Sequence, residues 1–222
     1  MGSMNEIIAF DMDGVLVDSK LSIIKSLNVA ISEFGFQPVK NSRHDLIGMT
    51  VREMLLSATN HQMTSEQLTT AITRYRATND RLGPLHSVVY QDVKEVLQKL
   101  SECFDLIVVT SKLQRSAIEL LRGLKLDHYF IGIFGPEVDG ISETKDMILS
   151  RATAKLNQEW NHEPKIRALV GDRDTDIKAA KKFGVQSVSA LWGYGSASEL
   201  RDSDIRVNEP NQLISVFSTP LD

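Results

Sequence analysis

The chain of 222 residues contains a single cysteine, Cys103, so it cannot form an internal disulfide. A chain without disulfides is typical of a reducing compartment, and we therefore expect a cytoplasmic protein. The sequence also lacks an apolar run long enough to span a bilayer. Its first residues lack the basic and apolar regions of a secretion signal. We therefore expect no membrane partner.

An excess of basic residues is missing as well. Lys and Arg number 25 against 29 Asp and Glu, which gives a net charge of −4, and no long basic run is present. A surface that binds nucleic acid needs clustered Lys and Arg, so no nucleic-acid partner is expected. Hydrophobic residues make up 42% of the chain, which is enough for an ordinary core. The length fits one domain with an insert, or two small domains.

Four short apolar runs predict the strands of a buried parallel sheet. They cover residues 7–10, 106–109, 166–170 and, more weakly, 185–190. Between them lie helical patterns, whose apolar positions are Val93, Val96, Leu97 and Leu100, then Ala117, Leu120, Leu121 and Leu124, then Met147, Ile148, Ala152 and Leu156, then the run 176–183. Strands that alternate with helices predict an α/β fold, a Rossmann-like doubly wound parallel sheet with helices on both faces.

The stretch 20–85 interrupts this alternation. It carries helical patterns at Leu21, Ile24, Leu27 and Ile31, at 51–57 and at 65–75, and no convincing strand. We interpret it as an inserted all-helical cap domain over the strand ends, with Gly83-Pro84 marking the return to the core. The predicted division is a catalytic core at 4–18 and 86–222 and a cap at 19–85.

Polar residues follow three of the predicted strands. Asp11 and Asp13 come after the first strand, Thr110 and Ser111 after the second, and Asp172 after the third. Ligands of parallel sheets bind at the carboxyl ends of the strands. One polar residue after a strand usually marks a turn, but three of suitable chemistry indicate a site. Two carboxylates two residues apart can divide nucleophilic attack and proton transfer between them, provided that a metal neutralises the charge.

The run 10–19, Phe-Asp-Met-Asp-Gly-Val-Leu-Val-Asp-Ser, resembles the first motif of the haloacid dehalogenase (HAD) superfamily in its phosphatase form. The resemblance implies that Asp11 attacks phosphorus and forms an aspartyl-phosphate. It also implies that Asp13 protonates the leaving oxygen and then activates water. Dehalogenases of the superfamily lack the second acid, because a halide leaves without a proton. The presence of Asp13 therefore favours oxygen leaving groups.

Two further segments resemble the second and third motifs of this superfamily. In the run 108–112, the resemblance implies that the Thr110 hydroxyl binds a phosphoryl oxygen with help from the Ser111 amide. The alternative is that Thr110 only caps the following helix. Lys145 stands where the motif lysine neutralises the nucleophile and the phosphoryl group. A lysine at a helix start opposes the helix dipole, which favours a functional reason for it.

The run 170–177 resembles the fourth motif. The resemblance implies a Mg²⁺ cofactor bound by the Asp11 carboxylate, the backbone carbonyl of Asp13 and the Asp172 carboxylate. Asp176, one helical turn later, is expected in the outer shell, and Asp174 is expected to face solvent. Few protein oxygens, completed by water and phosphate, are typical of a magnesium site. The alternative is an acidic helix start favoured by the dipole.

The place of the insert resembles the branch of phosphoglycolate phosphatases, 5′-nucleotidases and beta-phosphoglucomutases. In the run 47–53, which resembles the specificity loop of this branch, Arg52 is predicted to bind a distal anionic group. An ordinary surface arginine is an equal alternative there. We expect a magnesium-dependent phosphatase for a small phosphorylated metabolite, as a monomer or homodimer. The open alternatives are a sugar phosphomutase and a catalytically silent binding protein on the same fold. Phosphonate-cleaving members of the superfamily use a cap lysine, for which Lys20 is the nearest candidate, but a lysine there is more often a solvated charge.

Overall fold

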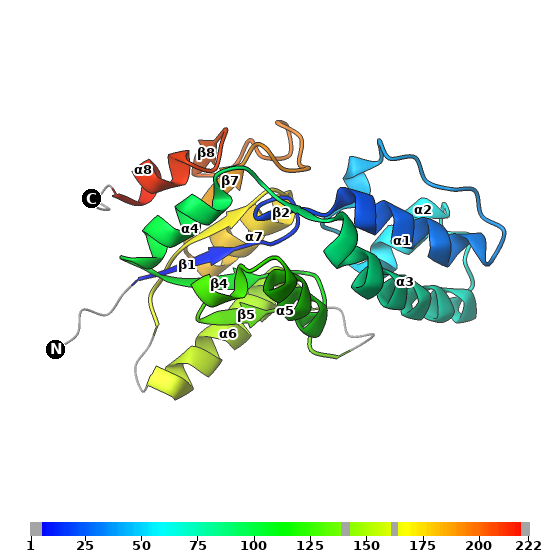
Figure 1. The fold of residues 1–222 in the computed structure, drawn as a ribbon, viewed down its shortest axis with the longest axis horizontal. Coiled ribbons are helices and arrows are strands. Elements are labelled where there is room, and N and C mark those ends of the chain that lie inside the picture. The colour runs from blue at the N-terminus through cyan, green and yellow to red at the C-terminus, as the bar shows by residue number, and fades with distance from the viewer. Residues whose placement is uncertain (1–5, 139–142, 161–163, 219–222) are drawn as a thin grey trace.

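The computed structural model describes residues 6–138, 143–160 and 164–218. The predicted start of the core at residue 4 and the run 140–142 before Lys145 lie outside these ranges. A six-stranded sheet forms the centre, in the order β5-β4-β1-β6-β7-β8, and every neighbouring pair is parallel (Figure 1). Its strands are β1 (Ile7–Phe10), β4 (Asp105–Val109), β5 (Gly132–Phe134), β6 (Ile166–Gly171), β7 (Gln186–Ala190) and β8 (Ile205–Val207).

Helices cover both faces of this sheet. The helices α4 (Val93–Ser101), α5 (Gln114–Gly123) and α8 (Gln212–Ser218) share one apolar cluster with alternate strand residues, and α6 (Lys145–Trp160) and α7 (Asp174–Phe183) share the other. In β1, Ile8 and Phe10 belong to the first cluster, and Ile7 and Ala9 to the second. This two-residue alternation explains why a strand buried on both faces is continuously apolar. The predicted doubly wound parallel sheet is confirmed.

Some elements of the core differ from the prediction. The edge strands β5 and β8 were not expected, because three residues are too few to show a strand pattern. Met147 is 52% exposed, and the inner face of α6 is formed by Ile148, Leu149, Ala152 and Leu156. The helix predicted over 176–183 is α7, which ends after Lys181, Lys182 and Phe183 at Gly184, with φ +75°.

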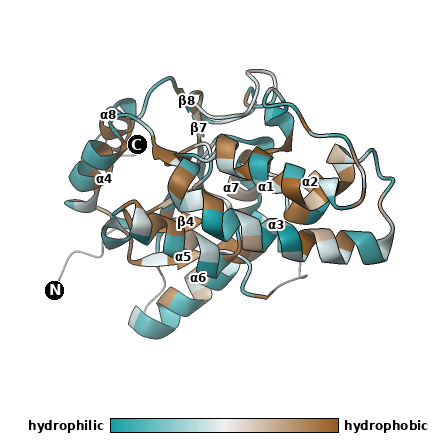
Figure 2. Cartoon of the chain, turned by 45° about the vertical axis from the view of Figure 1, so that its right-hand side comes forward, coloured by the Kyte–Doolittle hydropathy of each residue, from teal (hydrophilic) through white to brown (hydrophobic). Residues whose placement is uncertain are grey.

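The residues between β1 and the next core helix form a helical insert, Lys20–His86. It contains α1 (Lys20–Ser32), the 3₁₀ turn η1 (His44–Leu46), α2 (Val51–Ala58) and α3 (Ser65–His86), and it has an apolar cluster of its own. Capping boxes at Thr50 and Thr64 begin α2 and α3. In Figure 2 these helices carry both hydrophobic and hydrophilic segments, as amphipathic helices do. Leu21, predicted to be apolar-facing, is 40% exposed.

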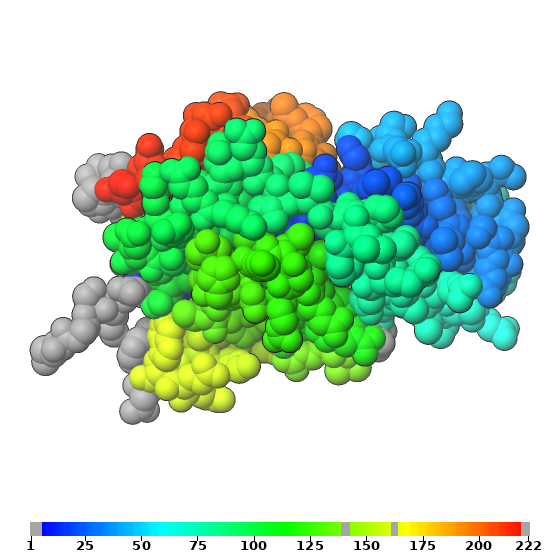
Figure 3. Space-filling view, in the orientation of Figure 1, coloured from blue at the N-terminus to red at the C-terminus, as the bar shows by residue number. Residues whose placement is uncertain are grey.

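The insert joins the core through two antiparallel two-residue strands, β2 (Val17–Asp18) and β3 (Val88–Val89). The predicted return at Gly83-Pro84 is wrong, because α3 continues through this pair to His86. Near its end α3 buries Thr78, Asn79 and Gly83, and Asn79 donates a hydrogen bond to Ser26 Oγ of α1 and accepts one from Lys112 Nζ. The division into core and cap domains stays a prediction. Figure 3 shows α3 and α5 side by side on the surface where insert and core meet.

No helix among the described residues is long and apolar enough to cross a membrane.

Candidate active site

Three predicted site residues follow three adjacent strands. Asp11 comes directly after β1, Thr110 directly after β4, and Asp172 directly after β6. Because β1 pairs with β4 on one side and with β6 on the other, their carboxyl ends meet at one edge of the sheet. All three side chains are buried there, at 3%, 1% and 0% exposure.

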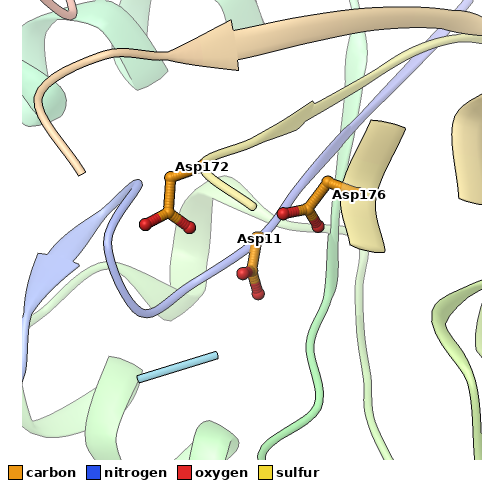
Figure 4. A group of neighbouring side chains, drawn as sticks. All are labelled: Asp11, Asp172 and Asp176. Carbon is orange, nitrogen blue, oxygen red and sulfur yellow. The ribbon is translucent and has the colours of Figure 1, made fainter. Parts of the chain in front are cut away.

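An acidic cluster of Asp11, Asp172 and Asp176 occupies this edge (Figure 4). One carboxylate oxygen of each residue lies within 4.8 Å of the others. Asp11 and Asp172 come from strand ends, whereas Asp176 comes from the first turn of α7. Buried carboxylates at this spacing repel one another, so the cluster needs cations to balance it.

Lys145 supplies one cation. Its Nζ lies 2.6 Å from Asp11 Oδ2, and it also donates a hydrogen bond to Asp176 Oδ1. Lys145 is the first residue of α6, and its side chain is buried. The unfavourable position at a helix start is therefore offset by two carboxylates. Burial lowers the pKa of Lys145, but the charges of Asp11 and Asp176 outweigh it and raise the pKa above the usual value.

The single positive charge of Lys145 does not balance the negative charge of the three carboxylates. Burial, opposed by Lys145 and reinforced by Asp176, raises the pKa of Asp11 to about 6 from an ordinary 3.8. Burial, with the charges of Asp11 and Asp176, also raises the pKa of Asp172 well above its usual range. A raised carboxyl pKa means that a further positive charge at this place is electrostatically favoured.

Asp172 offers an atom for that charge. Its Oδ2 accepts a hydrogen bond of 2.7 Å from the Tyr194 amide, whereas its buried Oδ1 has no hydrogen-bond donor among the described residues. A buried oxygen without a donor, beside two more carboxylates, fits a hard cation such as Mg²⁺. Both oxygens of Asp176 accept hydrogen bonds, from Lys145 and from the Arg173 amide, which agrees with an outer role.

Asp13 lies outside the acidic cluster. Its Oδ1 accepts a hydrogen bond of 2.5 Å from Ser19 Oγ, and its Oδ2 lies 3.4 Å from Lys112 Nζ. The next residue, Gly14, has φ +89°, and a Cβ there would lie 2.1 Å from Asp172 Oδ2. The loop after β1 therefore runs directly against Asp172, and only glycine fits that approach. The predicted metal contact through the Asp13 carbonyl stays a prediction.

Of the remaining predicted residues, Thr110 and Ser111 line the cavity at this edge and Arg52 does not. Thr110 accepts a hydrogen bond of 3.2 Å from the Lys112 amide, which leaves the hydrogen of its own hydroxyl available to a ligand. Ser111 is half-buried and lines the cavity described below. Arg52 is exposed on α2 and lines neither of the two cavities at this edge, so the structure does not bring it to the cluster.

A cavity of about 50 Å³ lies between the insert and the strand ends. Its core side includes Asp11, Asp13 and Thr110. Its insert side has both apolar and polar residues, which include Leu46, Met49, Met54, Tyr75, Arg76 and Asn79. A reactive edge with a pocket above it can hold a substrate whose reacting atom lies against the strand ends.

Sequence reasoning assigned no role to two polar residues of this cavity. Lys112 Nζ donates a hydrogen bond of 3.2 Å to Asn79 Oδ1 and thereby links the core to α3. The motif around Thr110 contained Lys112, but its spacing gave no indication of where the side chain points. Asn79 is buried within a helix whose periodic pattern had faded by Tyr75, so no sequence signal was available for it.

Comparison with known proteins agrees with this geometry. Residues 8–190 match the family model described as haloacid dehalogenase-like hydrolase. A tyrosine-protein kinase, PtkA, of Mycobacterium tuberculosis is 29% identical over 88% of the chain, but the chain spans only 65% of that relative. A phosphoglycolate phosphatase of Aquifex aeolicus is 27% identical, over 95% of the chain and 96% of the relative.

Among solved structures, one described as a predicted phosphatase from Clostridium acetobutylicum superposes with a TM-score of 0.86 at 28% identity, over 97% of this chain and 99% of that one. The family match covers most of the chain, including the three strand ends that carry Asp11, Thr110 and Asp172. The chain therefore belongs to the haloacid dehalogenase-like hydrolase family, as its motifs predict.

Proposed function

We propose that this protein is a magnesium-dependent phosphatase that hydrolyses a small phosphorylated metabolite through an aspartyl-phosphate on Asp11. The observation that carries the proposal is the Asp11 carboxylate, buried at the end of β1 beside Lys145 and beside Asp172, whose Oδ1 has no hydrogen-bond donor among the described residues. The similarity to the phosphoglycolate phosphatase of Aquifex aeolicus over nearly the full length of both chains supports the reaction class.

In the first half of the reaction, a carboxylate oxygen of Asp11 forms a bond to phosphorus while the bond from phosphorus to the leaving oxygen breaks. Asp13 gives its proton to that leaving oxygen, so the alcohol departs neutral. Ser19 and Lys112, which contact its two oxygens, orient the carboxyl group. Lys145, which contacts Asp11, and the buried Thr110 hydroxyl would hold the phosphoryl oxygens.

In the second half, Asp13 takes a proton from water, whose oxygen attacks phosphorus and releases Asp11 and inorganic phosphate. Asp11, Asp172 and the backbone at Asp13 would hold the metal, with Asp176 behind them. Magnesium, when bound, neutralises the negative charge that the carboxylates and the phosphoryl group share. Lys145 alone cannot balance it, since the pKa values of Asp11 and Asp172 stay raised beside it.

The leaving group would sit in the cavity above Asp11, whose volume is about 50 Å³. A larger cavity of about 670 Å³ adjoins it, shares Gly48, Met49 and Ser111 with it, and is lined by Lys145. The two cavities together can receive the rest of a phosphorylated metabolite, so a panel of substrates is needed to identify the leaving group.

The test is phosphate release from a panel of phosphate esters of increasing size, with Mg²⁺ and with EDTA. Wild type is compared with Asp11→Asn and with a matched control, Asp174→Asn. The control removes an acid that lies close in sequence to Asp172 and Asp176 but pairs on the surface with Lys178. We expect metal-dependent release that is lost in Asp11→Asn and kept in Asp174→Asn.

The two alternatives give different results. A sugar phosphomutase would release phosphate only slowly and would need a sugar bisphosphate for turnover. A silent binding protein would release none and would not be trapped by beryllofluoride with Mg²⁺. Release that is equal in wild type and Asp11→Asn would contradict the proposal.

A further inference from the structure

Arg173 connects the acidic cluster to the helical insert. It lies between Asp172 and Asp174, and its backbone N–H donates a hydrogen bond of 2.9 Å to Asp176 Oδ2. Its guanidinium group reaches across to residues more than 120 positions earlier in the chain. There it donates hydrogen bonds to the carbonyl of Ile47 and, at 3.4–3.5 Å, to the carbonyl of Asp45.

The core side of this contact is prearranged. Glu199 Oε1 accepts a hydrogen bond of 2.7 Å from Arg173 Nε and another of 3.0 Å from the Asp174 amide. The Arg173 side chain is only 12% exposed, so the charge of Glu199 compensates it in a poorly solvated place. Because Glu199 contacts Nε, the terminal nitrogens of the guanidinium remain directed at the insert.

The insert side is the segment Leu46–Met49, which we call the wall loop. All four of its residues line the cavity above Asp11, and Gly48 and Met49 also line a larger neighbouring cavity onto which Lys145 opens. Leu46 and Ile47 are fully buried, so the loop is anchored in the insert. Gly48 has φ +90°, and a Cβ there would lie 2.9 Å from Arg173 Cγ. The loop and the arginine are thus in close contact.

We propose that Arg173 is a positioning residue that holds the wall loop against the strand ends and so sets the space in which the leaving group sits. The proposal rests on the proposed phosphatase function. Any movement of the insert away from the strand ends breaks the hydrogen bonds to the Asp45 and Ile47 carbonyls. The pair with Glu199 stays in the core, so the guanidinium is ready to bind the loop when it returns.

The chain offers a matched control. Arg43 also binds Asp45, through the side-chain carboxylate at 2.8 Å, but it belongs to the insert and has no contact with the core among the described interactions. Arg43→Ala removes a guanidinium group that contacts Asp45, as Arg173 does, but it leaves the link between the wall loop and the acidic cluster intact. Gly48→Ala disturbs the same contact from the insert side and leaves Arg173 in place.

The experiment measures three properties of wild type, Arg173→Ala, Arg173→Lys, Gly48→Ala and Arg43→Ala. These are steady-state kinetics on the best small ester, the Mg²⁺ midpoint for thermal stabilisation, and hydrogen exchange of the backbone around the wall loop. For Arg173→Ala we expect kcat/KM to fall at least tenfold, chiefly through KM, because Asp11, Asp13 and Lys145 are unchanged. Exchange in the wall loop should quicken, and the Mg²⁺ midpoint should stay within twofold.

Gly48→Ala should show the same pattern and Arg43→Ala none of it. Arg173→Lys should recover only part of the loss, since one ammonium group cannot contact Glu199 and both carbonyls together. The proposal is overturned if Arg173→Ala leaves loop exchange and kcat/KM within twofold of wild type. It is also overturned if the Mg²⁺ midpoint shifts as much as kcat/KM does. Wild type that releases no phosphate would contradict the proposed function, whereas loop exchange tests the tether independently of activity.

Discussion

Replacing Asp11, the proposed nucleophile, should stabilise the metal-free protein. Asp11 is almost fully buried beside two other carboxylates, and its pKa of about 6 in the folded chain exceeds the ordinary 3.8. The folded state therefore holds this proton more tightly than the unfolded state. The ionisation of Asp11 therefore lowers the free energy of unfolding as the pH rises from about 3.8 to about 6. Above pH 6 this destabilisation stays at its full size.

The size of the effect follows from the two pKa values. At about 1.36 kcal/mol per pH unit, the rise from 3.8 to about 6 corresponds to about 3 kcal/mol. Asp11→Asn has the shape of the protonated acid and cannot ionise. At pH 8 in EDTA it should unfold with a free energy larger by about 3 kcal/mol, which corresponds to roughly 6–12 °C in Tm for a chain of this size.

The assay is urea and thermal unfolding of both proteins in EDTA between pH 3.5 and 8. The gain should shrink as the pH falls below about 6 and vanish near 3.8. In saturating Mg²⁺ wild type should become the more stable protein, because only wild type has the Asp11 carboxylate charge with which to bind the metal. If Asp11→Asn is the less stable protein at pH 8 in EDTA, the charge of Lys145 compensates the cluster and the reasoning is wrong.

Three further predictions concern single contacts. Lys145→Met should abolish phosphate release and lower the free energy of unfolding by about 3–5 kcal/mol at pH 8, because it leaves Asp11 and Asp176 without their shared cation; urea unfolding measures the loss, and an unchanged midpoint would refute it. Gly14→Ala should weaken Mg²⁺ binding at least tenfold, since its Cβ would lie 2.1 Å from Asp172 Oδ2, whereas Gly35→Ala, with a similar φ of +77° but no atom within 4 Å, should bind normally in the same titration. Asp204→Asn should destabilise the protein by about 1 kcal/mol at pH 7, because Asp204 accepts hydrogen bonds from the Ser187 hydroxyl and amide, which lower its pKa. That contribution is present above pH 3.8 and is lost as the pH falls through the lower folded pKa, so the two proteins should converge in acid unfolding.

The sequence was most informative where one local pattern had one structural meaning. The continuous apolar run at 7–10 predicts a strand buried on both faces, and β1 spans those residues. Short or polar-faced elements gave no such signal. The strand β5 has three residues, and the residues that α3 buries near its end are Thr78, Asn79 and Gly83. Neither segment shows the apolar period from which a strand or a helix is predicted.

By itself the sequence determined which chemistry the chain carries. The acids at 11, 13 and 172 each follow an apolar run, and Lys145 begins a helix, because these placements depend only on neighbours along the chain. Only the tertiary structure decided that β1 lies between β4 and β6, which brings Asp11, Thr110 and Asp172 to one edge, and that Arg173 meets a loop of the insert while Arg52 stays on the surface. The physical reason is that strand order and the direction of long side chains follow from packing between distant segments, which no local period encodes.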